Sequence, residues 1–262
     1  MNIGFIGGGA LAEAVIKGIA DKIVAAQNIF VADPVQARVE HLNQTYHVNA
    51  TVDADQFLDA LDILIVAVKP KDAVNALHGI SRLDKKTLIL SVVAGFPRSS
   101  IEKVFPEHAI IRVMPNVAVA VGEGMAALSP NARVNDEQLS IVKNIWSAIG
   151  RCVVLDENLM DAVTGLSGSG PAFAFLMIDA LSDGGVAAGL PRGVALELAA
   201  QTVLGAAKMV LAGGHPDVLR DRVTSPAGTT IEGVRVLEEA AVRSAFIEAV
   251  VAAADKSKEL AQ

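Results

Sequence analysis

Little in this 262-residue sequence is typical of disulfide-bonded, membrane or nucleic-acid-binding proteins. Its only cysteine, Cys152, can form no internal disulfide and no multi-cysteine metal site, so we expect a reducing compartment and no bound metal. No Lys/Arg block accompanies the formal net charge of −7, so no nucleic-acid surface is expected. No apolar run approaches ~18 residues and no basic segment opens the chain, so we expect no membrane span, no signal peptide and a cytoplasmic location.

What is present indicates a well-packed globular protein, because apolar residues make up 52% of the chain and charged residues 19%. In the first part of the chain, short apolar runs alternate with helix-like segments; the runs are 2–6, 28–33, 61–70, 87–95 and 109–116. This alternation predicts a doubly wound α/β sheet. Further on, Ala- and Leu-rich helical stretches replace the strand-like runs. We predict an α/β domain over residues 1–155 and an all-α domain over residues 156–262.

The first predicted strand leads into a glycine-rich turn and then a helix, in the segment GFIGGGALAEAV (4–15). Gly7-x-Gly9-x-x-Ala12 has the spacing of the dinucleotide-binding fingerprint of Rossmann-type domains. Gly7 permits the tight turn, and Gly9 lets the backbone approach a pyrophosphate at the helix start. We predict that this turn binds the cofactor through Ile6, Gly7, Gly8, Gly9, Ala10 and Leu11.

Asp33, at the end of the second predicted strand, has two interpretations. An acid at this place is typical of a hydrogen bond to the ribose 2′-hydroxyl of NAD. Alternatively, Asp33 caps the helix that follows, since Pro34 suits a first helical position. Arg38, one turn further, is either a partner for a 2′-phosphate or a solvated arginine on a helix face. We predict NADP(H) as the cofactor, its phosphate received by the first amides of this helix, with NAD as an alternative.

Three further segments end predicted strands, namely AVKP (67–70), VAG (93–95) and MPN (114–116). In open α/β sheets the ligand crevice lies outside the carboxyl ends of the strands. We therefore predict that the cofactor also contacts Ala67, Val68, Lys69, Pro70, Val93, Ala94, Gly95 and Asn116.

In the all-α domain, the segment 168–171 (GSGP) is predicted to break one helix and start another. The helix from Pro171 to Leu181 is apolar on nearly every side, so it must be buried all round. Burial against the partner of a dimer and burial as the central helix of a single-chain bundle are both open.

Five segments in this order resemble the pyrroline-5-carboxylate reductase family over nearly the whole chain: GFIGGG, AVKP, VMPN, GLSGSGPAF and DRVTSPAGTTIEGVRVLEE (221–239). The resemblance implies NAD(P)H-dependent reduction of the C=N bond of 1-pyrroline-5-carboxylate to L-proline, the last step of proline biosynthesis. It also implies a Rossmann domain followed by a helical domain that interleaves with a second subunit. The chain would then form a homodimer or a higher assembly of dimers, with the substrate at the dimer interface.

The resemblance also implies the substrate-binding residues, which are Asp221, Arg222, Ser225, Gly228, Thr229 and Thr230. The Thr230 hydroxyl would face the ring nitrogen as the catalytic group. Arg222 stands where the family often has Asn or Met, so a surface arginine is its alternative role. From the residues alone, Thr229-x-x-Glu232 has capping-box spacing, which predicts Thr229 as the helix N-cap. The amides of residues 227–230, at a positive helix end, suit a small carboxylate.

The sequence lacks a basic catalytic residue in the segment where related dehydrogenases have one, which fits the reduction of an imine. An imine can arrive already protonated, so its reduction depends on positioning and desolvation rather than on a strong protein acid. No Lys or His occurs between Cys152 and Ala207, where related hydroxyacid dehydrogenases place a catalytic lysine. Two alternatives remain: a reductase relative with another substrate, and a nucleotide-sensing protein that is not an enzyme.

Overall fold

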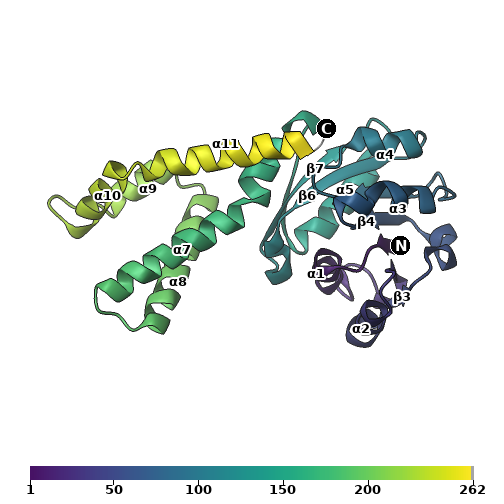
Figure 1. Ribbon diagram of the computed structural model, residues 1–262, viewed down its shortest axis with the longest axis horizontal. Helices are drawn as coiled ribbons and strands as arrows, with labels where there is room; N and C mark the ends of the chain where they lie inside the picture. Colours follow the sequence, from purple (N-terminus) through teal and green to yellow (C-terminus); the bar gives the residue numbers. More distant parts are fainter. Residues whose placement is uncertain (261–262) are drawn as a thin grey trace. The chain divides into compact units, whose positions relative to one another are not determined.

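The computed structural model describes residues 1–260 and contains one eight-stranded sheet with the order β3-β2-β1-β4-β5-β6-β7-β8 (Figure 1). The strands are β1 Ile3–Ile6, β2 Ile29–Ala32, β3 Asn49–Thr51, β4 Ile63–Val66, β5 Leu88–Ser91, β6 Ile110–Pro115, β7 Gly124–Pro130 and β8 Gly150–Val154. All neighbouring strands are parallel except β6 and β7. The predicted doubly wound α/β fold is confirmed.

Strands β1 and β4 are apolar throughout because both faces of the sheet are covered by helices. Successive side chains alternate between the faces: Ile63 and Ile65 of β4 belong to one core cluster, whereas Leu64 belongs to the other. The first cluster also contains side chains of α1 Ala10–Ile19, α2 Gln36–Tyr46 and α5 Asp136–Ser147. The second contains side chains of α3 Ala73–Gly79 and α4 Arg98–Val104.

The five predicted strand runs correspond to β1, β2, β4, β5 and β6. Sequence reasoning missed β3, β7 and β8. β3 is only three residues long, and β8 is largely exposed, so neither has the continuous apolar run of a central strand. β7 reads GMAALSP, whose small residues gave no strand signal although four of its seven positions are buried together as Ala126–Ser129.

The contacts within the chain divide it into two units. The sheet unit comprises Met1–Ser169 together with the chain from Ala252 onward, and the helical unit comprises Gly170–Val251. The predicted boundary near residue 155 falls just after β8, and the segment that follows it belongs by contacts to the sheet unit. The predicted domains, 1–155 and 156–262, remain a prediction.

The predicted helix break at residues 168–171 takes another form. Helix α6 (Met160–Val163) continues into a π-helical turn, Thr164–Gly168, and α7 (Gly170–Ala187) begins after Ser169, whose backbone is right-handed helical. Pro171 has no N–H to donate, and a widened turn is one way for a helix to accommodate that loss. The path therefore stays helical through the glycines.

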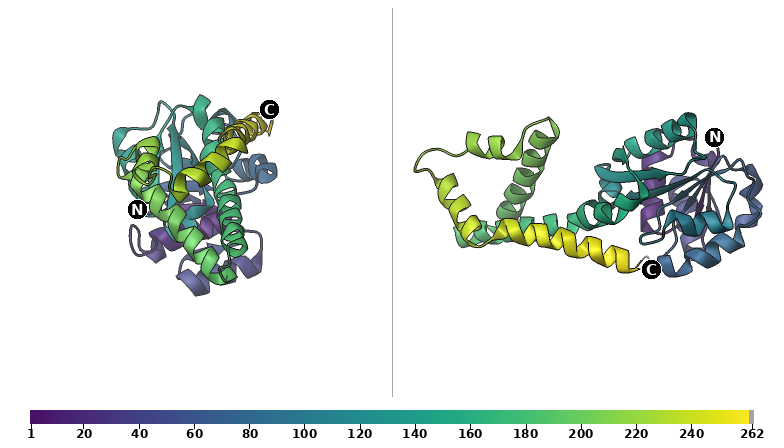
Figure 2. Two further views of the ribbon diagram at one scale, coloured as in Figure 1. Left: turned by 90° about the vertical axis from the view of Figure 1, so that its left-hand side faces the viewer. Right: turned by 90° about the horizontal axis from the view of Figure 1, so that it is seen from above.

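The helical unit contains α7, α8 (Arg192–Leu211), α9 (Pro216–Arg222), α10 (Thr229–Glu239) and the first part of α11 (Val242–Leu260). Helices α7 and α8 pack along each other as a pair (Figure 2). Their large apolar side chains are nevertheless exposed in the single chain, for example Phe175 at 63% and Leu176 at 71%. The expected burial of this surface is therefore not provided by the helical unit itself.

Helix α8 is also long and apolar enough to cross a membrane, judged by length and composition alone. The sequence-based expectation of no such segment missed it, because Arg192, Glu197 and Lys208 interrupt the apolar run. An apolar helix that packs against another subunit meets the same criterion.

Candidate functional site

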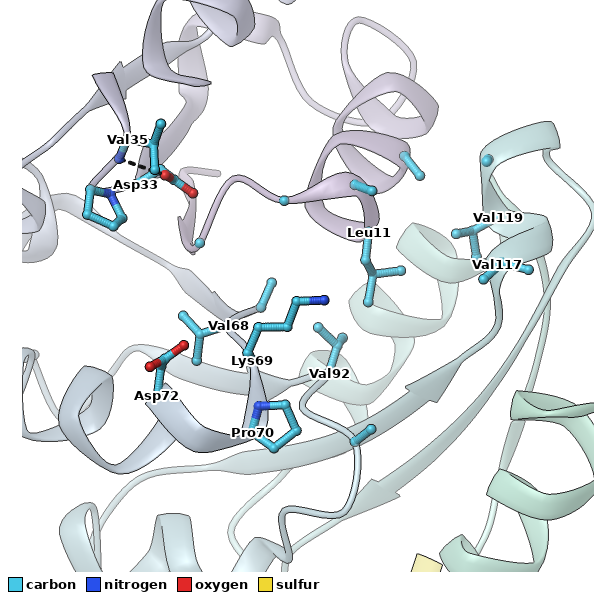
Figure 3. A pocket seen from close by; sticks show the side chains of 18 residues that line it. Leu11, Asp33, Val35, Val68, Lys69, Pro70, Asp72, Val92, Val117 and Val119 are labelled. Atoms are coloured by element: carbon cyan, nitrogen blue, oxygen red, sulfur yellow. Dashed lines mark hydrogen bonds between the residues drawn. The ribbon is translucent and has the colours of Figure 1, made fainter. Parts of the chain in front are cut away.

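A cavity of about 790 Å³ lies in the sheet unit at the carboxyl ends of β1 and β4 (Figure 3). From β1 the strand order runs in opposite directions through β2 and through β4, and this switch point is where open α/β sheets bind ligands. The cavity is lined by Gly7, Gly9, Ala10, Leu11, Ala14, Asp33, Pro34, Val35, Ala67, Val68, Lys69, Pro70, Asp72, Val92, Ala94, Val117, Val119 and Ala120.

The two outer glycines of the fingerprint are required for different reasons. Gly7 has φ +95°, and a Cβ there would lie 2.7 Å from the carbonyl oxygen of Ala67, so any other side chain would be both strained and clashing. A Cβ on Gly9 would meet nothing within 4 Å, so the space beside its backbone is open to a ligand. A turn that brings exposed amides to the start of α1 fits a pyrophosphate, so these residues fit a dinucleotide.

Most of the predicted cofactor residues line this cavity: Gly7, Gly9, Ala10, Leu11, Asp33, Ala67, Val68, Lys69, Pro70 and Ala94. Five do not: Ile6, Gly8, Val93, Gly95 and Asn116. Val93 is core, and the Asn116 side chain accepts hydrogen bonds from the amides of Ala118 and Met125.

Sequence reasoning missed eight lining residues: Ala14, Pro34, Val35, Asp72, Val92, Val117, Val119 and Ala120. Each lies within four residues of a predicted one, so extending each predicted edge by a turn would have found them. Leu11, Val92, Val117 and Val119 give one end of the cavity an apolar wall, and the Lys69 side chain projects among them in Figure 3.

Asp33 does not cap α2, which corrects one of its two interpretations. Helix α2 begins at Gln36, two residues later than a cap at Asp33 requires, and its N-cap is Val35. The Asp33 carboxylate instead accepts hydrogen bonds from the backbone N–H of Gly8 at 2.7 Å and of Val35 at 2.9 Å. Asp33 therefore ties the glycine turn to the end of β2.

The Arg38 side chain is hydrogen-bonded and only 25% exposed, so its prediction as a solvated arginine is wrong, whereas its predicted role toward a 2′-phosphate stays a prediction. Its Nε donates to the carbonyl of Gly8, and its Nη2 donates to Glu13. Glu13 also bonds His41 at 2.8 Å and accepts from the Tyr46 hydroxyl at 3.0 Å. Burial alone would raise the pKa of Glu13, but these hydrogen bonds and the charge of Arg38 lower it to about 2.

A second cavity of about 480 Å³ shares Gly7, Asp33, Pro34, Val68 and Asp72 with the first. It is rich in carboxylates, since Asp33, Asp53, Asp55 and Asp72 all line it. No Lys or Arg of the described chain is among its lining residues. This side of the site therefore carries negative charge.

The predicted substrate segment lies in the helical unit. Ser225–Gly228 forms a tight turn, closed by a hydrogen bond from the Gly228 N–H to the Ser225 carbonyl at 3.0 Å. Ala227 has φ +54°, a left-handed conformation that costs a non-glycine residue about 1 kcal/mol.

The capping-box prediction for Thr229 is wrong, because Gly228 is the N-cap of α10 and Thr229 is its first helical residue. A glycine cap has no side chain, so the first amides of α10 receive no side-chain cap. Thr229 is exposed and Thr230 is half-buried at this helix start. Oδ1 of Asp221 lies 3.5 Å from Nη2 of Arg220. Both Asp221 and Arg222 are exposed at the end of α9.

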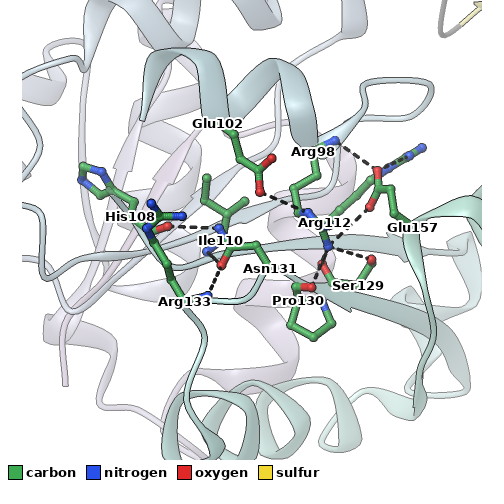
Figure 4. Close-up of polar contacts among 10 residues, drawn as sticks. All are labelled: Arg98, Glu102, His108, Ile110, Arg112, Ser129, Pro130, Asn131, Arg133 and Glu157. Atoms are coloured by element: carbon green, nitrogen blue, oxygen red, sulfur yellow. Dashed lines mark hydrogen bonds and ion pairs between the residues drawn. The ribbon is translucent and has the colours of Figure 1, made fainter. Parts of the chain in front are cut away.

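A cluster of hydrogen bonds and ion pairs holds the segment after β8 against the sheet (Figure 4). Glu157 accepts hydrogen bonds from Arg112 at 2.8 Å and from the backbone N–H of Arg98 at 3.1 Å. Burial opposes ionisation of Glu157, but these bonds prevail and lower its pKa. Arg98 also donates to the carbonyl of Pro130 at 2.6 Å, and none of these residues lines the first cavity.

Two family models match the chain. One, described as pyrroline-5-carboxylate reductase dimerisation, matches residues 157–260. The other, described as NADP oxidoreductase coenzyme F420-dependent, matches residues 2–95.

Known proteins match along nearly the full length. The pyrroline-5-carboxylate reductase of Synechocystis sp. is 48% identical over 99% of this chain and 98% of its own. A crystal structure of Plasmodium falciparum pyrroline carboxylate reductase with NADP bound is 32% identical, with a TM-score of 0.90 over 100% of this chain and 98% of its own. A Coxiella burnetii pyrroline-5-carboxylate reductase is 33% identical, with a TM-score of 0.93 over the same shares.

Proposed function

The chain belongs to the pyrroline-5-carboxylate reductase family, and from this membership we propose how its residues support the NAD(P)H-dependent reduction of 1-pyrroline-5-carboxylate to L-proline. The prediction of this activity is confirmed by relatives of that name at 40–48% identity. The assignment of individual residues is our proposal.

The cofactor is NADP(H), with NAD(H) as the alternative, and it supplies the hydride that adds to the imine carbon. We assign the pyrophosphate to Gly9 and the start of α1, where the backbone is open to a ligand, with Gly7 and Gly8 shaping the turn. The apolar end of the cavity, with Val92, Val117 and Val119, would exclude water from the nicotinamide. Of the predicted residues outside the cavity, Gly8 serves through its bonds to Asp33 and Arg38.

The start of α10 is the observation that carries the substrate assignment. Its cap is Gly228 and no side chain hydrogen-bonds the first amides, so these offer N–H donors at the positive end of the helix to a carboxylate. Ser225, Gly228 and Thr229 would border that carboxylate. The left-handed Ala227 fixes the turn in front of it.

Thr230 is the proposed catalytic residue. Its hydroxyl, half-buried in the first turn of α10, would hydrogen-bond the ring nitrogen and hold the proton there while the adjacent carbon accepts the hydride. The imine carries that proton on arrival, so no stronger acid is required. Asp221 and Arg222 would border the substrate from the end of α9.

The chain forms a homodimer, as the dimerisation family model over residues 157–260 indicates. The exposed side chains of α7 and α8, such as Phe175 and Leu176, supply the apolar surface for it. We propose that α8 packs in this interface rather than in a membrane, that the enzyme is cytoplasmic, and that it binds no nucleic acid. The net charge of −7 supports the last point.

The test compares 1-pyrroline-5-carboxylate with 1-pyrroline, the same ring without the carboxylate, in an assay of NADPH oxidation. We expect kcat/KM to be at least ~100-fold lower for 1-pyrroline, because the amides of α10 would lose their charged partner. Similar values for the two substrates would remove the start of α10 from substrate binding.

A further inference from the structure

The peptide groups of Gly8, at the centre of the glycine turn, are held from two sides. The N–H donates to Asp33 at 2.7 Å, and the carbonyl accepts from Nε of Arg38. Arg38 therefore lies beside the turn and close to Asp33, whose carboxylate borders both cavities. In dinucleotide-binding sheets, the acid at the end of the second strand is where the adenosine ribose lies.

Arg38 would be well placed for a 2′-phosphate on that ribose, but its charge is already engaged. Glu13 pairs with Arg38, and both side chains are about three-quarters buried, with exposed fractions of 24% and 25%. His41 and Tyr46 add two more hydrogen bonds to the same carboxylate. Because the pKa of Glu13 is about 2, the carboxylate stays ionised at neutral pH and Arg38 presents little free positive charge.

The carboxylates around Asp33 oppose a phosphate, although the uncapped first amides of α2 and Lys69 of the first cavity remain available as donors. The second cavity, which adjoins Asp33, is lined by Asp53, Asp55 and Asp72 as well; no Lys or Arg lines it in the described chain, although Arg82 pairs with Asp55 at 3.1 Å. A 2′-phosphate carries nearly two negative charges at neutral pH, so these carboxylates would weaken its binding and a released Arg38 would strengthen it.

We propose that Glu13 is a specificity-determining residue, which lowers the preference of the enzyme for NADPH over NADH by holding Arg38. Glu13 acts through Arg38 and is not itself a catalytic residue. The inference rests on the proposed function, since it concerns the nucleotide that the reductase uses.

The first experiment measures nucleotide binding by calorimetry and needs no turnover. Adenosine 2′,5′-bisphosphate and AMP are titrated into the wild type, Glu13→Gln and the control Glu40→Gln. Glu40 lies on α2 and also carries a negative charge, but its contact is with the side chain of Gln36. In Glu13→Gln, we expect the bisphosphate to bind ~10-fold more tightly and AMP to change less than ~2-fold. The control should leave both affinities within ~2-fold of the wild type.

A second variant identifies the cation. In Glu13→Gln/Arg38→Gln the gain in bisphosphate affinity should vanish, because a neutral amide pair replaces the ion pair. If Glu13→Gln proves unstable to heating, the double variant still tests the proposal. The ion pair of the wild type presents little net positive charge, so the double variant should bind the bisphosphate with the affinity of the wild type. A ~10-fold weaker affinity in the double variant would mean that Arg38 already binds the phosphate, which overturns the proposal.

Kinetics then connect binding to the reaction. With 1-pyrroline-5-carboxylate, the ratio of kcat/KM for NADPH to that for NADH should rise ~10-fold in Glu13→Gln. Equal losses with both cofactors would reduce Glu13 to a structural role in the glycine turn, and an unchanged ratio would show that Arg38 does not reach the phosphate. If the wild type bound nucleotide normally but did not reduce 1-pyrroline-5-carboxylate with either cofactor, that result would instead contradict the proposed reaction.

Discussion

Oδ2 of Asp33 lies 2.7 Å from the backbone nitrogen of Gly8, so a residue at the end of β2 fixes the turn that follows β1. The second oxygen accepts from the N–H of Val35 at 2.9 Å. Both oxygens thus have backbone donors and still border the cavity, where a ribose hydroxyl could share them. One carboxylate can therefore stabilise the glycine turn and discriminate between cofactors.

Replacing Asp33 separates those two roles. In Asp33→Ser the negative charge beside the ribose is lost, so we expect the ratio of kcat/KM for NADPH to that for NADH to rise. The hydrogen bonds to Gly8 and Val35 weaken, which should lower the free energy of unfolding by ~1 kcal/mol in urea titrations. An unchanged cofactor ratio would show that Asp33 only supports the turn.

Thr230→Val keeps the shape of the side chain and removes its hydroxyl. We expect kcat/KM for 1-pyrroline-5-carboxylate to fall ~10- to 100-fold, the scale of one hydrogen bond in a site without water. The dissociation constant of NADPH, measured by fluorescence, should hardly change. Thr202→Val on α8 makes the same change elsewhere in the helical unit and serves as the control. A fully active Thr230→Val would exclude this hydroxyl from the reaction.

Phe175→Glu tests whether the apolar surface of α7 is the dimer interface. Phe175 is 63% exposed in the single chain, so a glutamate there would harm little unless a partner covers it. A buried, unpaired charge costs several kcal/mol, and we expect the dimer to dissociate or the helical unit to unfold, with loss of turnover. The sheet unit should still bind nucleotide. Light scattering gives the mass, Gln44→Glu at an exposed position of α2 in the sheet unit is the control, and an active monomer would contradict the interface.

Glu13 should make stability depend on acid. Its pKa of about 2 in the folded chain lies below the ordinary value of 4.5, so the ionised form stabilises the fold above about pH 4.5. That contribution is lost as the pH falls from about 4.5 towards 2. Urea unfolding of the wild type and Glu13→Gln should therefore differ by ~1–2 kcal/mol at pH 6 and converge near pH 2. A constant difference across this range would show that Glu13 titrates normally.

The sequence predicted the parts of the fold that depend on continuous local patterns. The buried runs of β1, β4 and β5 and the Gly7-x-Gly9-x-x-Ala12 spacing each follow from a few neighbouring residues, and together they placed the cofactor cavity. The two wrong helix caps, Asp33 and Thr229, show where such reasoning ends. Both residues have good capping chemistry. Helix α2, however, begins two residues later than a cap at Asp33 requires, and α10 begins at Thr229 itself, so neither residue is an N-cap.

The remaining features depend on contacts that join distant residues. Glu13 meets Arg38, His41 and Tyr46 only because α1 and α2 lie on the same face of the sheet, and no spacing rule connects these four residues. The left-handed backbone of Ala227 was likewise hidden, since alanine does not signal that conformation as glycine does.

The division of the chain into units has a consequence for the order in which the protein can fold. The Ser257 hydroxyl, in a residue only 4% exposed, donates to Asp161 at 2.7 Å, and both residues belong to the sheet unit although the whole helical unit lies between them in sequence. During synthesis the sheet can form from the first residues onward, but this bond must wait for the last turns of α11 to leave the ribosome. Closing it is a late, long-range step, so a chain stalled after Val251 would leave Asp161 without this partner and its surroundings open to water.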